Sequence, residues 1–397
     1  MLQDILLPIL VPYFSSTCSR WDLHSSTHSN SNRNVFVETA LGYALSYIYS
    51  VANSTPARIT ILADNDYYST TNASSDECSS VSRPSNRFHN FSVRLEEANK
   101  TGLGSSAALV TAITAAILSF HLPRQQFDLS SEPSRRILHN LAQAAHCAAQ
   151  GKVGSGFDVA SAVYGSCLYR RFSPSILSSS ADPGTPDFMG ALRTLVEEGN
   201  LDHKWDTEIQ RDAVKVPKGL RLVLCDVSGG SQTPGMVKQV LAWRKEKPQE
   251  ADAIWTDLHA ANESLAKEMK ALAEEQNFGL ERLKACFKRI RSGIRTMSEK
   301  SGVPIEPPEQ TELIDACEAV PGVIGGVVPG AGGYDAISLL IEDKEATIAE
   351  LDDLFERWNR RNEQGATRSG RVSMLGVRAE MAGVKQEQWQ DYDEWLA

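Results

Sequence analysis

The stretch Lys100-Thr-Gly-Leu-Gly-Ser-Ser-Ala-Ala-Leu-Val-Thr111 carries the strongest indication of how this chain folds. Two glycines and two serines precede a run of small and apolar residues, which predicts a helix over 107–119. Such a turn points backbone N–H groups and the positive end of the helix dipole at one place. The glycines let the backbone turn tightly, and the serines can cap the helix or contact phosphate or magnesium. The stretch predicts a phosphate-binding turn.

Two common phosphate-binding patterns do not fit this turn. It has no Gly-Lys-Ser/Thr at the spacing of a Walker A loop. It also lacks the third glycine of the dinucleotide-binding fingerprint. A tight turn before a capped helix is the alternative, but the serine pair and the basic residue Lys100 in front of it favour a phosphate site.

Composition excludes several classes of protein. A chain of 397 residues can bury a sizeable core and form two lobes. A net charge of −10 argues against a general nucleic-acid binder, so any anion site must be a local basic patch. The seven cysteines are scattered without a Cys-x-x-Cys pair, which argues against a disulfide framework or zinc and favours a reducing, cytoplasmic setting.

The first 14 residues are apolar, but they lack the basic region of a signal peptide and contain Asp4. They are also too short to span a bilayer. We therefore expect no targeting peptide and no membrane segment.

Apolar periodicity predicts a mixed α+β protein in two lobes. Helices are expected at 36–51, 107–119, 133–150, 234–245, 249–275, 279–300 and 345–360. Strands are expected at 58–63, 165–172, 220–226, 322–328 and 335–341. The Ser/Asn-rich segments 15–34 and 70–90 predict loops.

A second glycine-rich segment, Gly151-Lys-Val-Gly-Ser-Gly-Phe-Asp158, follows the helix expected at 133–150. It places Asp158 at the end of a tight loop. An acid beside a phosphate loop can act as a base, or can orient a hydroxyl that attacks a γ-phosphate. Helix capping by Asp158 is the alternative reading. Lys152 can meet a phosphate, although a lone lysine is more often a surface residue.

Two further turns carry candidate binding residues. In Pro329-Gly-Ala-Gly-Gly-Tyr-Asp335, Gly332 and Gly333 would let the backbone pass close to a phosphate. A glycine-rich hairpin explains this segment equally well. In the turn over 226–234, Ser231 is a candidate substrate contact, and an ordinary turn before a helix is the alternative.

Arg291 and Arg295 share one face of a predicted helix because they are four residues apart. Arginine binds phosphate through two parallel hydrogen bonds, so this face is a candidate site for a charged substrate. A solvated helix surface is the alternative.

Together these segments resemble the GHMP kinases, a family named for galacto-, homoserine, mevalonate and phosphomevalonate kinases. The run 100–108 resembles the family's second motif and 329–335 its third. The finer resemblance is to the eukaryotic, fungal-type branch whose acceptor is 5-phosphomevalonate. It rests on His139-Asn-Leu-Ala-Gln-Ala-Ala-His-Cys147, Ala149-Gln-Gly-Lys-Val-Gly-Ser-Gly-Phe-Asp-Val159, Tyr169-Arg-Arg-Phe172 and Ile305-Glu-Pro-Pro-Glu-Gln-Thr311.

The resemblance implies a two-lobed fold with an N-terminal lobe like ribosomal protein S5 and a C-terminal ferredoxin-like lobe. It implies transfer of a phosphate from ATP, with Mg²⁺, to (R)-5-phosphomevalonate in the mevalonate route to isoprenoids and sterols. The products would be 5-diphosphomevalonate and ADP. The substrates are small molecules, and the protein would act as a monomer or homodimer.

By position in the motifs, the resemblance also assigns roles to residues. The ATP phosphates would be cradled by Gly102, Leu103, Gly104, Ser105, Ser106 and Ala107, with Ser106 as the magnesium contact. Asp158 matches the catalytic aspartate, and Lys100 and Lys152 would neutralise the transferring charge. The expected acceptor-side residues are Ser231, Arg291, Arg295, Gly332 and Gly333.

The family's first motif, an early Ala-Pro-Gly-Lys, is absent, and the resemblance begins at about Asn34. We therefore expect an atypical segment over 1–34, an incomplete N-terminal lobe over 35–185 and a C-terminal lobe over 186–397. Losing strands would leave sheet edges unpaired, so the sequence predicts a chain that is less stable or less active alone.

Two alternatives stay open. Another GHMP kinase such as mevalonate kinase is disfavoured by the block 305–311 and by His146, which stands where mevalonate kinase has a magnesium-binding glutamate. A non-catalytic protein that binds nucleotide or a phosphorylated metabolite is favoured by the missing motif. The presence of Lys100, Ser106 and Asp158 counts against it.

Overall fold

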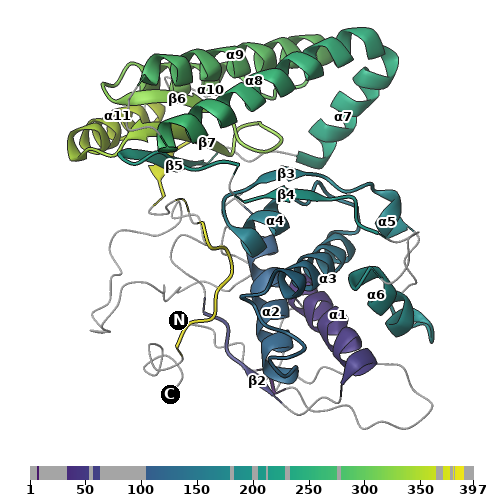
Figure 1. The fold of residues 1–397 in the computed structure, drawn as a ribbon. Helices are drawn as coiled ribbons and strands as arrows, with labels where there is room; N and C mark the ends of the chain where they lie inside the picture. The colour runs from purple at the N-terminus through teal and green to yellow at the C-terminus, as the bar shows by residue number, and fades with distance from the viewer. Residues whose placement is uncertain are drawn as a thin grey trace.

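The computed structural model forms two lobes, one above the other in Figure 1. It describes residues 7–8, 34–52, 57–62, 104–178, 183–198, 204–211, 213–228, 233–274, 279–363, 370–375, 379 and 381–388. Among these residues, no helix is both long and apolar enough to cross a membrane.

The N-terminal lobe is a bundle of helices with two short strand pairs. Its helices are α1 (Val35–Val51), α2 (Ser105–His121), α3 (Glu132–Gln150), α4 (Phe157–Tyr164), α5 (Ser175–Ser178) and α6 (Phe188–Val196). Its antiparallel strand pairs are β1 (Leu7–Pro8) with β2 (Arg58–Ile59), and β3 (Leu168–Arg170) with β4 (Glu208–Gln210). Helices α1, α2 and α3 pack against one another and form the core.

Helix α3 shows how the sequence fixes this bundle. Ser131 caps its start by accepting a hydrogen bond from the Ser134 amide at 3.3 Å, and Pro133 occupies the first turn. Gly151 ends it in the left-handed conformation, with φ 66°. Asn140 on the buried face donates to the Val196 carbonyl at 3.1 Å, so α3 holds the end of α6.

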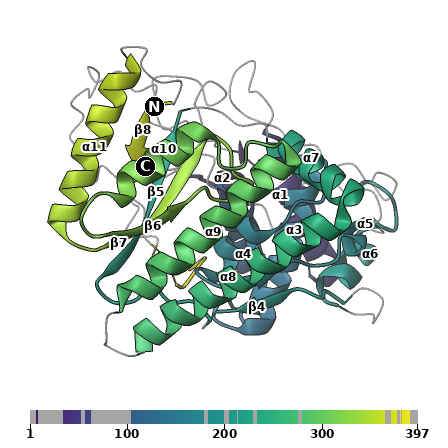
Figure 2. The ribbon, with the colours of Figure 1, turned by 90° about the horizontal axis from the view of Figure 1, so that it is seen from above.

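The C-terminal lobe is built on a four-stranded antiparallel sheet in the order β6-β7-β5-β8. The strands are β5 (Leu220–Val227), β6 (Val323–Val327), β7 (Ala336–Glu342) and β8 (Val372–Met374). Its helices are α7 (Thr233–Glu246), α8 (Pro248–Glu274), α9 (Leu280–Ser301), α10 (Pro308–Glu318) and α11 (Glu345–Glu363). Figure 2 shows α8 and α9 running side by side.

Alternation along β7 places side chains in two different cores. Ile337, Leu339 and Ile341 join a core with apolar side chains of α10 and α11. Leu340 instead packs with side chains of α8 and α9. Because successive side chains of a strand point to opposite faces, both faces of β7 are covered.

The boundary between the lobes differs from the one expected at 185/186. Helix α6 packs on α1 and α3, and its Leu192 and Leu195 belong to the N-terminal core. Trp205 lies in the same core, where its indole N–H donates to the Leu195 carbonyl at 3.0 Å. The N-terminal lobe therefore extends through β4, and β5 begins the C-terminal lobe. The apolar face of α6 packs on the first lobe. A boundary placed at the Ser/Pro-rich linker before α6 does not take this packing into account.

The chain also returns to the N-terminal lobe after β8. The Val384 amide donates to the Ala162 carbonyl at 2.8 Å, and Arg135 donates to the Ala382 carbonyl at 3.0 Å. A Cβ added to Gly383 would lie 2.4 Å from the Val163 carbonyl oxygen, so only glycine lets the two backbones approach this closely. This segment, yellow in Figure 1, ties the end of α4 to the C-terminal part of the chain.

His139 of α3 predicts a specific pH dependence of stability. Its side chain is buried between Tyr164 and Trp205, and burial lowers the pKa of His139 to about 4. The unfolded chain therefore binds more protons between pH 6.5 and 4, and stability falls as the pH falls through that range. The full shift corresponds to about 3 kcal/mol.

We expect the substitution His139→Leu to flatten the pH dependence of the free energy of unfolding between pH 7 and 4, measured by urea denaturation. His259 is exposed on α8, so His259→Leu is the matched control and should leave the pH dependence unchanged. An equally steep decline in the His139 variant would contradict the assignment.

Candidate active site

The starts of two helices meet at the expected phosphate-binding turn. Gly104 precedes α2 with φ 90°, and Gly156 precedes α4 with φ 82°. Neither glycine has a side chain to cap its helix, so neither start carries an N-cap side-chain hydrogen bond. A Cβ added to Gly104 would lie 3.5 Å from Asp158 Cβ, which shows how closely the two turns approach. Both helix dipoles therefore favour an anion at their starts.

Gly156 is required by its surroundings as well as by its backbone angle. A Cβ at this position would lie 2.4 Å from Gln143 Oε1 and 2.7 Å from the Tyr169 hydroxyl. The Tyr169 hydroxyl in turn donates to the Ser155 carbonyl at 2.9 Å. This packing fixes the turn that presents Asp158.

Contacts connect Ser106 of α2 to His146 of α3, and His146 to Asp158 of α4. Ser106 Oγ lies 3.0 Å from His146 Nε2, and His146 Nδ1 lies 3.9 Å from Asp158 Oδ2. The Gln150 amide nitrogen is 3.3 Å from the same His146 Nε2. An amide NH₂ only donates and a carboxylate only accepts, so both neighbours favour the tautomer with the proton on Nδ1. Ser106 then donates to the imidazole and keeps its oxygen lone pairs for another partner.

The surroundings of His146 favour the neutral form of its imidazole. The His146 side chain is only 3% exposed, and burial lowers the pKa of His146. The Asp158 carboxylate opposes that shift, whereas the positive charge of Lys152 reinforces it. Asp158 is more accessible than His146, and its Oδ1 accepts from the Val159 amide at 3.0 Å. The site therefore presents a fixed carboxylate, a hydroxyl oxygen and an exposed lysine around two helix starts.

The third glycine segment lies against the start of α4. Gly333 donates its amide to the Ile305 carbonyl at 2.8 Å, and a Cβ on Gly332 would lie 2.2 Å from that carbonyl oxygen. A Cβ on Gly330 would lie 3.8 Å from the ring of Phe157, the residue before Asp158. The turn of one lobe thereby reaches the side chain that precedes Asp158 in the other.

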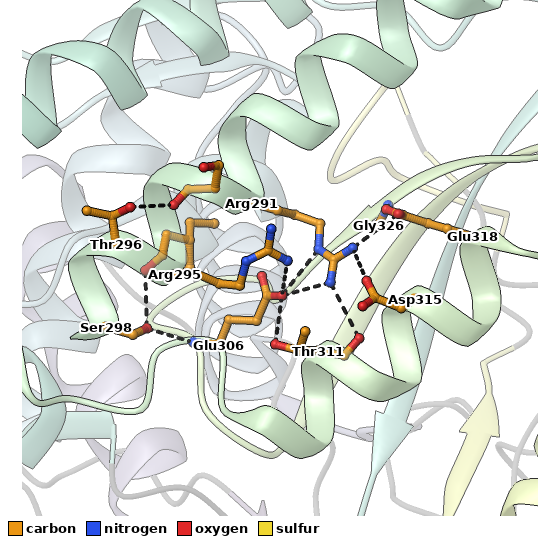
Figure 3. A network of polar contacts seen from close by, with 11 residues as sticks. Arg291, Arg295, Thr296, Ser298, Glu306, Thr311, Asp315, Glu318 and Gly326 are labelled. Atoms are coloured by element: carbon orange, nitrogen blue, oxygen red, sulfur yellow. Dashed lines mark hydrogen bonds and ion pairs between the residues drawn. The ribbon is translucent and has the colours of Figure 1, made fainter.

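In the structure, Arg291 and Arg295 form ion pairs with acidic residues of their own lobe. Arg291 is buried in α9 and pairs with Glu306, Asp315 and Glu318 at 2.8, 2.7 and 3.1 Å (Figure 3). Arg295 is 40% exposed and shares Glu306 at 3.4 Å. Three carboxylates already compensate Arg291 within the lobe, and the expected role of Arg291 and Arg295 in binding an acceptor phosphate stays a prediction. The sequence showed the spacing of the arginines, but not that acidic residues of a neighbouring helix would face them.

The remaining expected site residues have different outcomes. Gly104, Ser106, Lys152 and Asp158 come together as described, and Ala107 is buried in the first turn of α2. Four positions lie outside the described residues, namely Lys100, Gly102, Leu103 and Ser231. Ser105 begins α2.

Oxygen donors at this site suit a magnesium ion. No cluster of three or more acidic, histidine or cysteine side chains that could hold a metal occurs among the described residues. Ser106 and Asp158 would supply one hydroxyl and one carboxylate, and Mg²⁺ commonly takes its remaining ligands from substrate phosphates and water. The residues present therefore fit an ion held jointly with a polyphosphate.

Sequence reasoning missed the structural role of several residues. His146 was singled out only as a departure from a related pattern, yet it links Ser106 to Asp158. Glu306 and Gln310 were seen only as part of a motif. The four-residue spacing of His146 and Gln150 on α3 is the one signal that the sequence offered for their shared face.

Comparison with known proteins shows the family to which the chain belongs. Residues 87–166 match the GHMP kinases N terminal domain, and residues 267–360 match the GHMP kinases C terminal model. Phosphomevalonate kinase erg8 of Aspergillus fumigatus is 53% identical over 92% of this chain and 76% of its own length. The Gibberella zeae phosphomevalonate kinase is 48% identical over 92% and 79%, and a peroxisomal phosphomevalonate kinase of Arabidopsis thaliana is 33% identical over 79% and 73%.

A solved structure shares the fold. The Lin0012 protein from Listeria innocua superposes with a TM-score of 0.56 over 88% of this chain and 82% of that chain, at 19% identity. This likeness supports the two-lobed architecture. The family models and the relatives show that the chain belongs to the phosphomevalonate kinases of the GHMP kinase family.

Proposed function

We propose that this chain transfers a phosphate from ATP to (R)-5-phosphomevalonate, giving 5-diphosphomevalonate and ADP. The relatives that carry the name phosphomevalonate kinase support this acceptor. The observation that carries the chemistry is the meeting of two helix starts around Ser106, His146 and Asp158. Such starts favour the charged oxygens of a polyphosphate.

The catalytic contribution of Asp158 is positional and electrostatic. A phosphate acceptor is already largely ionised at neutral pH, so its attacking oxygen needs no strong base. Phosphoryl transfer depends mainly on alignment and on compensation of the developing charge. We propose that Asp158, fixed by the Val159 amide, orients the reacting phosphate groups at the start of α4. Lys152, and Lys100 by its place before the loop, would compensate the transferring charge.

We propose Mg²⁺ as the metal, held by Ser106, Asp158 and the nucleotide phosphates. When bound, the ion supplies positive charge to the phosphate oxygens. The His146 ring orients Ser106, because the hydroxyl proton is directed to Nε2. The serine oxygen is thereby left as a ligand, and the imidazole stays neutral.

We further propose that the protein acts in the cytoplasm as a monomer or homodimer on small molecules, without binding nucleic acid. The free thiols among the described residues, Cys147, Cys167, Cys225, Cys286 and Cys317, support a reducing compartment. The net charge of −10 supports the exclusion of nucleic acid.

The variant Asp158→Asn tests the catalytic assignment. We expect kcat for ADP release with ATP and phosphomevalonate to fall by about 100-fold or more, because a fixed charge beside the reacting groups is lost. Asp187 is exposed and makes no cap hydrogen bond, so Asp187→Asn is the matched control. A kcat within twofold of the parent chain would exclude Asp158 from catalysis.

The variant Ser106→Ala tests the metal contact. We expect the Mg²⁺ concentration for half-maximal activity to rise by about tenfold, because one oxygen ligand is removed. Ser178 is exposed and donates to the Pro174 carbonyl just before α5, so Ser178→Ala is the matched control and should leave the Mg²⁺ dependence unchanged. An unaltered Mg²⁺ dependence in the Ser106 variant would show that the hydroxyl does not contact the ion.

A further inference from the structure

A connected set of polar side chains in the C-terminal lobe, the Arg291 network, is centred on the buried pair Arg291 and Glu306 and includes Arg295, Thr311, Asp315 and Glu318 (Figure 3). The side chain of Arg291 is 4% exposed and that of Glu306 is fully buried. Arg291 donates to Glu306 from both Nε and Nη2, at 3.3 and 2.8 Å. This pairing lies between α9 and the segment that leads into α10.

Buried ion pairs contribute little net stability, because the cost of removing both charges from water offsets their attraction. Burial alone would lower the pKa of Arg291, but its hydrogen bonds to Glu306 and Asp315 outweigh that effect and keep it charged. Apolar residues would fill such a position at equal or lower cost. The role of the network is therefore to fix the position of the segment that leads into α10, rather than to add net stability.

Glu306 is held from three directions. Besides Arg291, the Thr311 hydroxyl donates to Glu306 Oε1 at 3.1 Å, and the Glu306 amide donates to Ser298 Oγ at 3.2 Å. Arg295 adds a fourth contact at 3.4 Å. The chain at 305–306 is thus fixed to both α9 and α10.

Ile305 of this segment and Gln310 of α10 each make one hydrogen bond to the glycine-rich turn. The Ile305 carbonyl accepts from the Gly333 amide at 2.8 Å. Gln310 is buried, and its Nε2 donates to the Tyr334 carbonyl at 2.9 Å. The backbones at Gly332 and Ile305 approach so closely that any side chain at Gly332 would collide with Ile305. The position of the turn follows directly from the position of 305–310.

The glycine-rich turn also contacts the N-terminal lobe, so the position of 305–310 affects both lobes. Gly330 faces the ring of Phe157, which is about half exposed and directly precedes Asp158. Movement of the segment 305–310 would move the turn, and with it the surface that lies against the start of α4.

We propose that Arg291 and Glu306 are positioning residues for phosphoryl transfer, which hold Ile305 and Gln310 so that the glycine-rich turn lies against the ring of Phe157, the residue before Asp158. This inference rests on the proposed function. Neither residue is required to touch a substrate, and both act through the backbone at Gly333 and Tyr334.

Glu306→Gln and Arg291→Met test this proposal through two readouts. In the assay, we expect kcat to fall by about tenfold to 100-fold, while KM for ATP changes less than threefold. The reason is that the variants disturb the alignment of the reacting groups more than they weaken the binding of ATP. Arg291→Lys should not restore kcat, because an ammonium cannot reproduce the guanidinium fork that contacts three carboxylates. Arg289 is exposed on the same helix and pairs with Asp257, so Arg289→Met is the matched control and should retain full activity.

Amide hydrogen exchange supplies a readout that does not depend on activity. We expect faster exchange over 330–335 and 157–160 in both variants, with unchanged exchange over 138–147 in the core of α3. Unchanged exchange over 330–335, or an equal increase everywhere, would overturn the proposal. An inactive parent chain with the expected exchange pattern would instead refute only the proposed function.

Gln310→Met keeps the test decisive if the charge variants do not fold. It removes the hydrogen bond to the Tyr334 carbonyl without disturbing any ion pair. Faster exchange over 330–335 with reduced kcat supports the proposal, and parent-like values of both contradict it.

Discussion

The close approach of the α2 start to the α4 start is the constraint on which the rest of the molecule depends. Two glycines with positive φ bring the backbone at Gly104 next to the side chain of Asp158. The arrangement leaves two helix ends without N-cap side chains, which would be unfavourable unless an anion or water completes them. The packing of α3 beneath both ends then supplies His146, which contacts Ser106, and Gln150, which contacts His146. This local turn geometry is the basis of the proposed polyphosphate site.

The C-terminal lobe places its glycine-rich turn, 329–335, beside the Phe157 ring at the start of α4. Its sheet is covered on both sides of β7, so the turn between β6 and β7 emerges from a rigid frame. The Arg291 network adds a second attachment through Ile305 and Gln310. Residues 382–384 also cross back to the end of α4, so the lobes are joined by more than one connection.

The sequence predicted those parts of the structure that local patterns encode. The helices over 133–150 and 279–300 and the strand over 220–226 agree with α3, α9 and β5 within one or two residues, because capping residues and apolar spacing mark them. Helices α6 and α10 were missed, since α6 lies beyond a Ser/Pro-rich segment and α10 begins at the second of two consecutive prolines, which resemble a loop. Asp158 and Ser106 were found through glycine spacing and resemblance. The true environment of Arg291 depends on acidic residues 15 to 27 positions away, and no local pattern reports such pairing.

The most direct test of the central claim is the reaction itself, followed by ³¹P NMR with the purified chain, ATP, Mg²⁺ and either phosphomevalonate or mevalonate. The predicted result is a new diphosphate signal with matched ADP formation from phosphomevalonate, and no phosphorylated product from mevalonate. ADP formation no faster than background hydrolysis with phosphomevalonate, or preferential phosphorylation of mevalonate, would contradict the assignment of this site.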